Sequence, residues 1–459
     1  MIDWAIVGTL LASIHKRRRT IEANMGFLCR ESPRFQNIDY PLSPFPLAVA
    51  ATRFDDHRET AEHYMNLLER VINLYHTSAE VRSYFGLRPE EENLVRADTR
   101  LTPSIRIARL DGYLAQGNST IRFLENNTDC PAGILFTERL NLLVDRVIEC
   151  AVAETGVKRI DMPFDQTDCA RQELLAAYRQ QGGTKTNPII AILQISGKSN
   201  VESVEMAEEF SARGTPTFVA DPREVVVSAD GVRLEGREVD LIWNKVNTVY
   251  WNRLVADSPG LLGHWADVIA SRETCHINPF AARYITESKL CSSFFQEQEF
   301  AHYFELVERE FLGRVLPWSR KLVAGKLVEY DSESWEISEL LLARQADFVI
   351  KEPYDIRGDG VTIGRSVDRK CWVEGVDRAI REGHMAQEFI VGQTYPVLTE
   401  VREMEVLPMT TSFDSFMFGG RLSGLGSKAG LGHKVNLFQG GRKLAVRVYA
   451  PMERGTTWA

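Results

Sequence analysis

The segment from Asn187 to Pro222 constrains the fold more than any other part of this sequence. It contains a short apolar run (NPIIAILQI), a stretch with helical character (NVESVEMAEEFSARG) and a second apolar run (TPTFVADP). Two buried strands joined by a helix are typical of a βαβ unit with parallel strands. Hairpin patterns occur as well, for example VVVSADGVRLEG around Asp230-Gly231. We therefore predict a mixed fold, α/β in this segment and α+β elsewhere.

Length and composition limit the class of protein. The chain has 459 residues, of which 44% are hydrophobic, so it has enough apolar material for a large packed core. At about 150 residues per domain, this length suggests about three structural units. Acidic residues (63) outnumber basic ones (54), and a net charge of −9 lacks the basic footprint of a nucleic-acid-binding protein. The seven cysteines are scattered and form no C-x-x-C pair, which favours reduced intracellular thiols.

The N-terminal apolar stretch from Ile2 to Ile14 is followed by a basic run from Lys16 to Arg19. A signal peptide carries its positive charge before the apolar run, and this run is too short to span a bilayer. We predict instead a helix that buries one face and ends in a basic turn. The protein is expected to be cytoplasmic and to contact no membrane.

A polar, glycine-containing loop, KEPYDIRGDGVTIG, begins at Lys351, where a predicted strand ends. Gly358 and Gly360 would let backbone N–H groups approach phosphate oxygens, because no Cβ stands in the way. Lys351 and Arg357 offer a point charge and a planar fork for the same anion. The pattern predicts a phosphate-binding loop, with a hairpin loop carrying exposed basic residues as the alternative. It matches neither the Walker A nor the Rossmann glycine pattern.

Two further segments, IRIARLDGYL and STIRFLENN, predict strands joined by a turn at residues 116–118. Arg109 and Asp111 lie two residues apart, as do Glu125 and Asn127, so each pair points to one face of its strand. If the strands pair, the four side chains converge. Two carboxylates and an amide oxygen are ligands that suit Mg²⁺. The alternative is a solvent-facing polar hairpin with an Arg–Asp ion pair.

Two later segments bear on the same site. HMAQEFI, which contains Gln387, Glu388 and Ile390, predicts a strand whose edge offers backbone groups to an adenine ring. An ordinary strand explains this pattern as well. The glycine-rich segment SFMFGGRLSGLGSKAGLG, which contains Arg421, is predicted to close over a site.

Other polar segments each have two explanations. Ser196-Gly197-Lys198 follows the first apolar run and either binds an anion at a helix N-terminus or is an ordinary turn. NPFAARYITESKL contains Asn278, Arg283 and Lys289, and a helix start capped by Thr286 explains its last residues as well as a functional role does. The histidines show no H-E-x-x-H spacing, and we predict that all seven cysteines are structural.

These pieces occur in a specific order along the chain. The R-x-D and E-x-N segments come first, then the strand lysine with its loop, then the Q-E strand, then GGRLSG and VNLFQGG. In this order they resemble the circularly permuted ATP-grasp ligases, specifically the glutathionylspermidine synthetase-like family. The resemblance covers roughly residues 100–135 and 280–450. The family has Lys-Pro where this chain has Lys351-Glu352-Pro353, and the loop here carries an extra acid, Asp359.

The resemblance implies a role for each candidate residue. Three arginines would contact the substrate carboxylate and the transferred phosphoryl group: Arg109, Arg357 and Arg421. One or two Mg²⁺ ions would be held by Asp111, Glu125 and Asn127. ATP would be contacted by Lys351, Gly358, Gly360, Gln387, Glu388 and Ile390. A second ATP lysine is expected before Lys351, and it is either Lys321, which we favour, or Lys326.

The resemblance also implies the architecture and the reaction. A permuted ATP-grasp fold would divide into N-terminal helices with the metal-binding hairpin (1–135), a preATP-grasp-like βαβ substrate domain (136–285) and a nucleotide-binding region with a lid loop (286–459). The reaction would join a small-molecule carboxylate to an amine through an acylphosphate, releasing ADP and phosphate. The family allows a homodimer. A ligase that modifies a peptide or carrier protein, or a non-catalytic ATP-binding regulatory protein, is the alternative.

Overall fold

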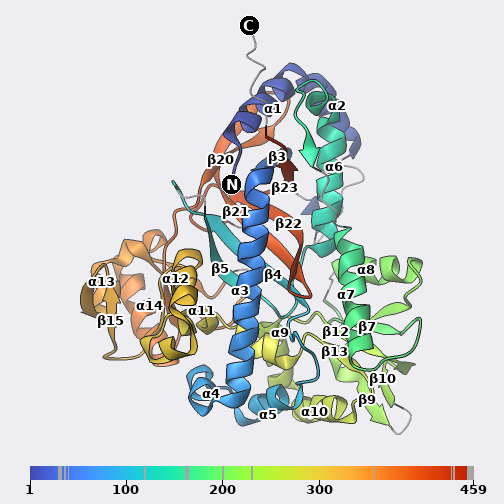
Figure 1. Cartoon of the computed structure of the whole chain (residues 1–459), viewed down its shortest axis with the longest axis vertical. Coiled ribbons are helices and arrows are strands. Elements are labelled where there is room, and N and C mark those ends of the chain that lie inside the picture. The colour runs from blue at the N-terminus through green and yellow to red at the C-terminus, as the bar shows by residue number, and fades with distance from the viewer. Residues whose placement is uncertain are drawn as a thin grey trace.

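A computed structural model of the chain describes residues 1–28, 34–35, 38–39, 41–117, 120–160, 165–198, 201–228, 231–356, 358–435, 437 and 440–451. Asn118, Asp230 and Arg357 lie outside these ranges. The turns predicted at residues 116–118 and around Asp230-Gly231 are therefore only partly described. Three sheets of four or more strands organise the described part, each with its own helices (Figure 1).

The largest sheet has eight strands and is built from both ends of the sequence. Its order is β3-β23-β22-β21-β4-β5, with β20 paired to β21 and β6 to β23. The bounds are Leu42–Ala50 (β3), Ile107–Leu114 (β4), Ile121–Asn127 (β5), Arg159–Ile160 (β6), Thr394–Glu400 (β20), Glu405–Phe418 (β21), Arg421–Gly430 (β22) and Arg442–Tyr449 (β23). β3 and β23 pair in parallel, and the pairs from β23 to β5 are antiparallel.

Helix α3, from the first third of the chain, covers one face of this sheet. α3 runs along the sheet in Figure 1, and His57 of α3 lies 2.8 Å from the Ser415 hydroxyl of β21. Because side chains alternate along a strand, Asp414 next to it points to the opposite face. The N-terminal helix α1 begins at an Asp3 cap, buries Ile6, Leu10 and Ile14, and ends at Lys16, as predicted. The bounds are Trp4–Lys16 (α1), Arg18–Leu28 (α2), Ala51–Thr77 (α3), Ala79–Phe85 (α4) and Pro89–Ala97 (α5).

The second sheet contains the predicted βαβ unit. Its order is β13-β12-β7-β8, and all its pairs are parallel. Its strands are Ile190–Leu193 (β7), Thr217–Ala220 (β8), Leu241–Asn244 (β12) and Cys275–Ile277 (β13), and its helices are Gln166–Gln180 (α7), Val201–Ala212 (α8), Thr248–Asp257 (α9) and Leu261–Ser271 (α10). Ile134–Val152 (α6) lies instead on the large sheet, against β3 and β23. The predicted hairpin after β8 forms within a small sheet of Val225–Ser228 (β9), Gly231–Leu234 (β10) and Arg237–Glu238 (β11). Trp243 of β12 and Phe210 of α8 stack in the hydrophobic core between the parallel sheet and its helix.

The third sheet is antiparallel, in the order β14-β19-β17-β18. Its strands are Ser319–Lys321 (β14), Phe348–Lys351 (β17), Val361–Ile363 (β18) and Met385–Glu388 (β19). Ile337–Ala343 (α13) and Arg369–Glu382 (α14) pack on it around Phe348 and Trp372. The remaining elements are Arg34–Phe35 (β1), Ile38–Asp39 (β2), Leu290–Phe294 (α11), Leu306–Val315 (α12), Leu327–Tyr330 (β15) and Glu333–Glu336 (β16).

Two sequence predictions in the last third were wrong. The segment 394–408 (TYPVLTEVREMEVLP) has the sequence pattern of a single strand, but a turn at residues 401–404 divides it into the antiparallel strands β20 and β21. The glycine-rich segment around Arg421 is not a closing loop, because most of it is strand β22. A Cβ at Gly424 would collide with the Gln166 amide, and one at Gly426 would lie 3.2 Å from Thr137 Cγ2. These glycines therefore allow close packing against a strand.

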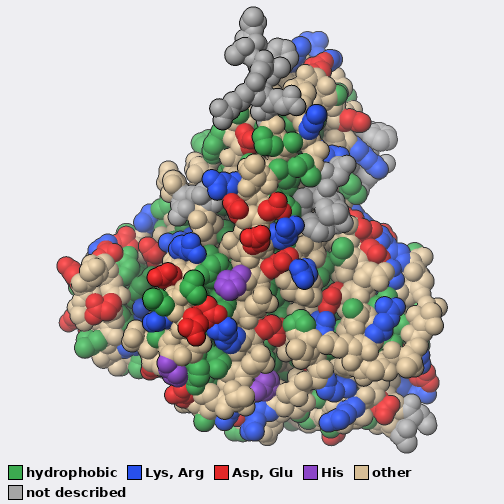
Figure 2. All heavy atoms as spheres, viewed as in Figure 1, with side chains coloured by type: hydrophobic (Ala, Val, Ile, Leu, Met, Phe, Trp, Pro, Cys, Tyr) green, Lys and Arg blue, Asp and Glu red, His purple; other side chains and the backbone are tan. Residues whose placement is uncertain are grey.

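The described helices include none that is long and apolar enough to cross a membrane. The six cysteines within the described ranges are free thiols. On the face shown in Figure 2, acidic and basic side chains are interspersed, and no single-sign patch dominates it.

Gly112→Ala is expected to destabilise the fold. A Cβ at Gly112 would lie 2.7 Å from the Arg122 carbonyl oxygen and 2.9 Å from Ile121 Cγ1, so the backbone of the β4–β5 hairpin would have to shift. Overpacking of this kind costs about 1–3 kcal/mol. The midpoint of denaturant unfolding measures the loss. Gly8→Ala is the control, because its Cβ would have nothing within 4 Å. Equal midpoints for the two variants would contradict the expectation.

Candidate active site

The polar hairpin predicted from the sequence forms. β4 and β5 pair antiparallel, with Arg109 opposite Asn127 and Asp111 opposite Glu125. Directly opposed residues of an antiparallel pair point to the same face, so the four side chains gather there. The Asn127 amide nitrogen donates to the Arg109 carbonyl oxygen at 3.3 Å, which leaves its own oxygen directed elsewhere.

Asn278 fastens this hairpin to the parallel sheet. It directly follows β13 and is buried. Its Oδ1 accepts from the backbone N–H groups of Arg106 (2.9 Å) and Ile107 (3.0 Å). Its Nδ2 donates to the carbonyl oxygens of Ile107 and Thr128, both at 2.7 Å. One side chain thus fixes the beginning of β4 and the end of β5.

Asp111 is held by two cations. Arg109 donates from Nε at 2.5 Å and from Nη2 at 2.9 Å, and Lys428 of β22 donates from Nζ at 3.1 Å. Burial alone would raise the pKa of Asp111, but the charges of Arg109 and Lys428 outweigh it and hold that pKa well below its ordinary value. Lys428 Nζ also lies 3.3 Å from Asp414 of β21.

The antiparallel sheet presents two lysines on one face. Lys321 and Lys351 both stand opposite the buried Met385, one on each neighbouring strand, so the three side chains point the same way. Gln387 lies two residues further along β19 and shares this face. Its Oε1 accepts from Lys351 Nζ at 2.7 Å, and its Nε2 donates to the Ser319 hydroxyl at 3.2 Å.

Lys351 is a buried ammonium group without a carboxylate partner. Its Nζ donates to the Leu124 carbonyl oxygen of β5 at 3.0 Å and to Gln387, and among the described residues no carboxylate lies within 4.0 Å of it. Burial lowers its pKa from 10.5 to about 8. A desolvated cation of this kind is well suited to receive an anionic ligand.

Lys289 joins the hairpin to the loop that follows β17. Its Nζ lies 2.5 Å from Asp355 Oδ1 and 3.6 Å from Glu125 Oε2. The two carboxylates therefore approach the same ammonium group from the two sides of the interface. Burial opposes the charge on Lys289, but Glu125 and Asp355 raise its pKa above the ordinary value.

The donor set of the hairpin fits a hard cation. No group of three or more His, Cys, Asp and Glu side chains in the described ranges is already arranged around one point. Asp111 and Glu125 are nevertheless opposite one another in register, Asn127 adds an amide oxygen, and Asp355 faces Glu125 across Lys289. Such oxygens suit Mg²⁺, which takes few protein ligands and completes its shell with water and phosphate.

Comparison with known proteins decides the fold. No protein-family model and no curated protein sequence matches this chain. A glutathione synthetase-like effector from Globodera pallida, solved in its apo form, aligns over 98% of both chains with a TM-score of 0.57 and 12% identity. The chain has an ATP-grasp fold. This confirms the predicted fold class, while the permuted order of its segments stays a prediction.

Two further solved structures align with lower TM-scores than the effector. A gamma-glutamylcysteine synthetase-like protein from Methylobacillus flagellatus covers 81% of this chain and 84% of that one, with a TM-score of 0.39 and 12% identity. A RimK-domain ATP-grasp protein from Sphaerobacter thermophilus covers 53% of this chain and 91% of that one, with a TM-score of 0.27 and 14% identity.

The glycine-containing loop of this ATP-grasp protein contacts a segment that sequence analysis did not single out. Lys434, beyond β22, donates from Nζ to the Gly358 carbonyl oxygen. Gly358 has φ +73°, which favours glycine, and a Cβ there would collide with Lys434. Gly360 is approached by Glu352 and Asp355, whose Cβ atoms would lie 3.0 and 2.9 Å from a Cβ at this position.

The adenine side was predicted from Gln387, Glu388 and Ile390. Glu388 ends β19, and its backbone N–H donates to the Trp318 carbonyl oxygen at 2.8 Å. Ile390 follows and is half-buried. Of the two lysines left open, Lys326 is ion-paired with Glu297 at 2.7 Å. Lys321 instead donates to the Tyr84 carbonyl oxygen, and burial lowers its pKa.

Arg421 is not brought into this cluster. It lies at the start of β22, its side chain is 80% exposed, and its Nη1 is 3.5 Å from Glu62 of α3. It lines a separate polar cavity of about 540 Å³ between α3, the segment 99–105 and the 419–421 turn. The structure therefore gives no support to a catalytic role for Arg421.

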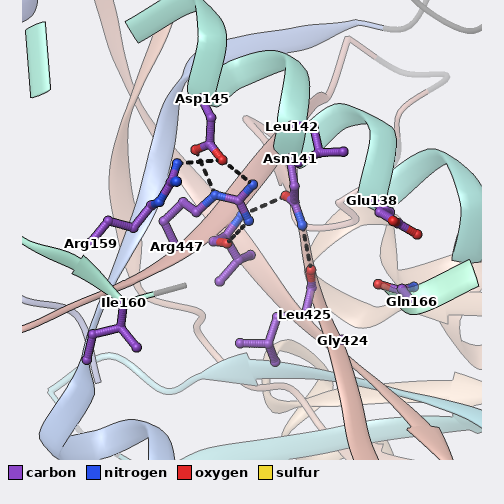
Figure 3. Close-up of a pocket in the computed structure, with 11 residues that line it drawn as sticks. Glu138, Asn141, Leu142, Asp145, Arg159, Ile160, Gln166, Gly424, Leu425 and Arg447 are labelled. Carbon is purple, nitrogen blue, oxygen red and sulfur yellow. Dashed lines mark hydrogen bonds and ion pairs between the residues drawn. The ribbon is translucent and has the colours of Figure 1, made fainter. Parts of the chain in front are cut away.

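A second cavity, of about 140 Å³, lies between α6, β22 and β23 (Figure 3). Asp145 points into it from α6 and pairs with Arg447 at 2.7 Å and with Arg159 at 2.6 Å. Asn141 accepts from the backbone N–H of Val446. These groups are satisfied mainly by one another, so the cluster fastens α6 to the sheet.

Several charged residues of the site were missed or left open by sequence analysis. Lys428 and Asp414 lie in strands that are buried on both faces, and no regular alternation of polar and apolar residues marks them in the sequence. Asp355 stands four residues after Lys351, within the loop already singled out. Lys289 had been explained by a helix capped by Thr286, but the Thr286 hydroxyl bonds to Ala282 and Thr128 instead.

Proposed function

We propose that this protein is an ATP-dependent carboxylate–amine ligase that works through an acylphosphate. The observation that carries the proposal is the pair Lys351 and Lys321. Two ammonium groups with no carboxylate partner among the described residues share one sheet face, and Lys351 reaches the hairpin strand that carries Glu125. A polyphosphate bound between the antiparallel sheet and the β4–β5 hairpin would meet the uncompensated positive charge of the two lysines on one side. On the other side it would meet metal-binding oxygens.

In the proposed complex, Asp111, Glu125, Asn127 and Asp355 hold one or two Mg²⁺ ions. Bound Mg²⁺ supplies neutralisation of the charge that develops on the phosphate oxygens. Lys351 and Lys321 bind the phosphates, and Gln387 orients Lys351 through its 2.7 Å hydrogen bond. Gly358 and Gly360 let the loop backbone approach, and Glu388 and Ile390 border the base.

The γ-phosphoryl group then passes to a carboxylate oxygen of the substrate, and ADP leaves. The amine attacks the acyl carbon, the C–O bond to phosphate breaks, and an amide and inorganic phosphate form. Such transfer depends on positioning and charge compensation more than on acid–base groups, which fits a site of Lys, Arg and carboxylates. Arg109 is proposed to contact the substrate carboxylate or the transferred group. The matching role of Arg357 stays a prediction.

The acid or amine substrate is proposed to bind outside the carboxyl ends of β7 and β12. The order β13-β12-β7-β8 reverses between these two strands, which is where open α/β sheets bind ligands. Gln194 Oε1 and Asn244 Nδ2 are buried there and have no hydrogen-bond partner within the described part of the chain. Lys245 donates to the Pro131 carbonyl oxygen at 3.2 Å, and Arg109 donates to that of Ala132 at 2.6 Å. The segment 131–132 therefore connects the end of β12 to Arg109.

The proposal is tested by the products of turnover. Pools of small carboxylates are incubated with the protein, ATP, Mg²⁺ and hydroxylamine, which captures an activated acyl group as a hydroxamate. ADP, phosphate and hydroxamate in equal amounts are the expected products. AMP and pyrophosphate would show adenylate chemistry and contradict the proposal. Turnover seen only after a peptide or carrier protein is added would assign the site to a modifying ligase.

A further inference from the structure

Five charged side chains form an alternating chain across the large sheet. Arg109 and Asp111 lie on β4, Lys428 on β22, Asp414 on β21 and Lys443 on β23. Arg109 contacts Asp111 at 2.5 Å, Lys428 contacts Asp111 at 3.1 Å and Asp414 at 3.3 Å, and Lys443 lies 3.9 Å from Asp414. Three cations and two anions therefore alternate along it.

Asp111 is the member of this chain that the proposed function assigns to a metal. In the structure its carboxylate is already compensated by Arg109 on both oxygens and by Lys428 on one. A divalent cation that approaches Asp111 meets these two positive charges at close range. At a site as poorly hydrated as this one, like charges repel strongly. A free metal ion must therefore displace at least one of them.

Lys428 has a second partner within reach. Its Nζ is almost equally distant from Asp111 and Asp414, and Asp414 is only 1% exposed. Lys428 can thus give up Asp111 without becoming an unpaired buried cation. Lys443, also buried, shares Asp414 with it, so this transfer leaves two ammonium groups on one carboxylate. The surplus positive charge favours a polyanion at the site.

We propose that Lys428 is a built-in counter-ion of Asp111 that couples divalent-cation binding to nucleotide binding. Without a polyphosphate, Lys428 competes with the metal for Asp111. With a polyphosphate, the negative charge of the ligand compensates Lys428 and Arg109, and Asp111 becomes available to the metal. Metal and nucleotide then bind cooperatively by linkage. This inference rests on the metal site of the proposed function.

The test measures Mn²⁺ binding from the electron paramagnetic resonance signal of the free ion, alone and with saturating ADP. Lys428→Met is expected to bind Mn²⁺ alone about tenfold more tightly than the unmodified protein, and its gain in Mn²⁺ affinity on adding ADP is expected to be about tenfold smaller. Lys428→Arg keeps the charge and is expected to resemble the unmodified protein. Lys443→Met also removes one positive charge, but Lys443 contacts Asp414 and not Asp111. Its effect on Mn²⁺ affinity is therefore expected to be several-fold smaller.

The outcomes separate this inference from the proposed function. If Mn²⁺ binds with ADP and Asp111→Asn abolishes that binding, the metal site stands. If Lys428→Met then binds free Mn²⁺ no more tightly than the unmodified protein, the counter-ion role is overturned. If no variant binds Mn²⁺ with or without ADP, the metal site itself is wrong. Circular dichroism checks each fold, and Lys428→Gln replaces Lys428→Met if the latter does not fold.

Discussion

Glu125→Gln is expected to lower turnover by about 10³-fold or more while the protein stays folded. The substitution keeps the size of the side chain and its hydrogen-bonding capacity but removes the charge that a hard cation requires. Glu125 is only partly buried and pairs with Lys289 at 3.6 Å, so we expect the neutral amide to leave the fold intact. Initial rates of ADP release measure the loss.

Metal dependence distinguishes ligation from other roles of Glu125. Partial recovery of the variant at raised Mg²⁺ or with Mn²⁺ is expected, because a weakened site fills at a higher ion concentration. Glu329→Gln is the matched control, since Glu329 is exposed on a strand outside the site. Activity of Glu125→Gln within about tenfold of the unmodified protein would contradict the metal assignment.

Lys351→Met is expected to weaken ADP binding by about 10²-fold, because removing one partner of a buried charge contact costs about 2–5 kcal/mol. Lys351 is 7% exposed and has no carboxylate partner among the described residues, so the nucleotide would be its main counter-charge. Equilibrium titration with ADP measures the effect. Lys326→Met is the control, because Glu297 already neutralises Lys326. Similar losses in both variants would contradict a specific role for Lys351.

The pKa of Lys351 adds a pH signature. Because burial lowers it to about 8, the ammonium group loses its proton above that pH in the free protein. ADP affinity should therefore fall as pH rises above about 8, and the fall should disappear in Lys351→Met. The sign for stability is opposite. Between pH 8 and 10.5 the unfolded chain binds more protons at this group, so its contribution to stability rises with pH. Below pH 8 the buried charge opposes folding, and Lys351→Met should unfold at a higher denaturant concentration.

The local sequence pattern was sufficient to predict side-chain orientation wherever a single strand or a short hairpin determines it. The period of two along β4 and β5 placed Arg109, Asp111, Glu125 and Asn127 on one face, and their pairing follows from a short connection. The apolar runs of the βαβ unit likewise required a parallel pair. Both conclusions depend only on neighbours in the sequence, which is why they could be drawn without a structure.

The same local reasoning failed where packing from another part of the chain sets the conformation. The glycines of β22 resemble those of a mobile loop, yet Gly424 and Gly426 make room for Gln166 and Thr137. Arg421 was assigned to the site with that loop, and it instead pairs with Glu62 on the opposite side of β22. The identity of a residue does not reveal which distant side chain approaches it.

The sequence by itself determined that the four polar side chains of β4 and β5 share one face, and which loop carries the lysine and glycines. Only the tertiary structure decided which strands become neighbours, and with them the partners of Asp111 and Glu125. Lys428 and Asp414 come from the far end of the chain, and Lys289, directly before α11, meets Asp355 of the loop after β17. The physical reason is that strand direction and side-chain alternation are properties of the local backbone. Strand order depends on the burial of apolar surface summed over the whole molecule.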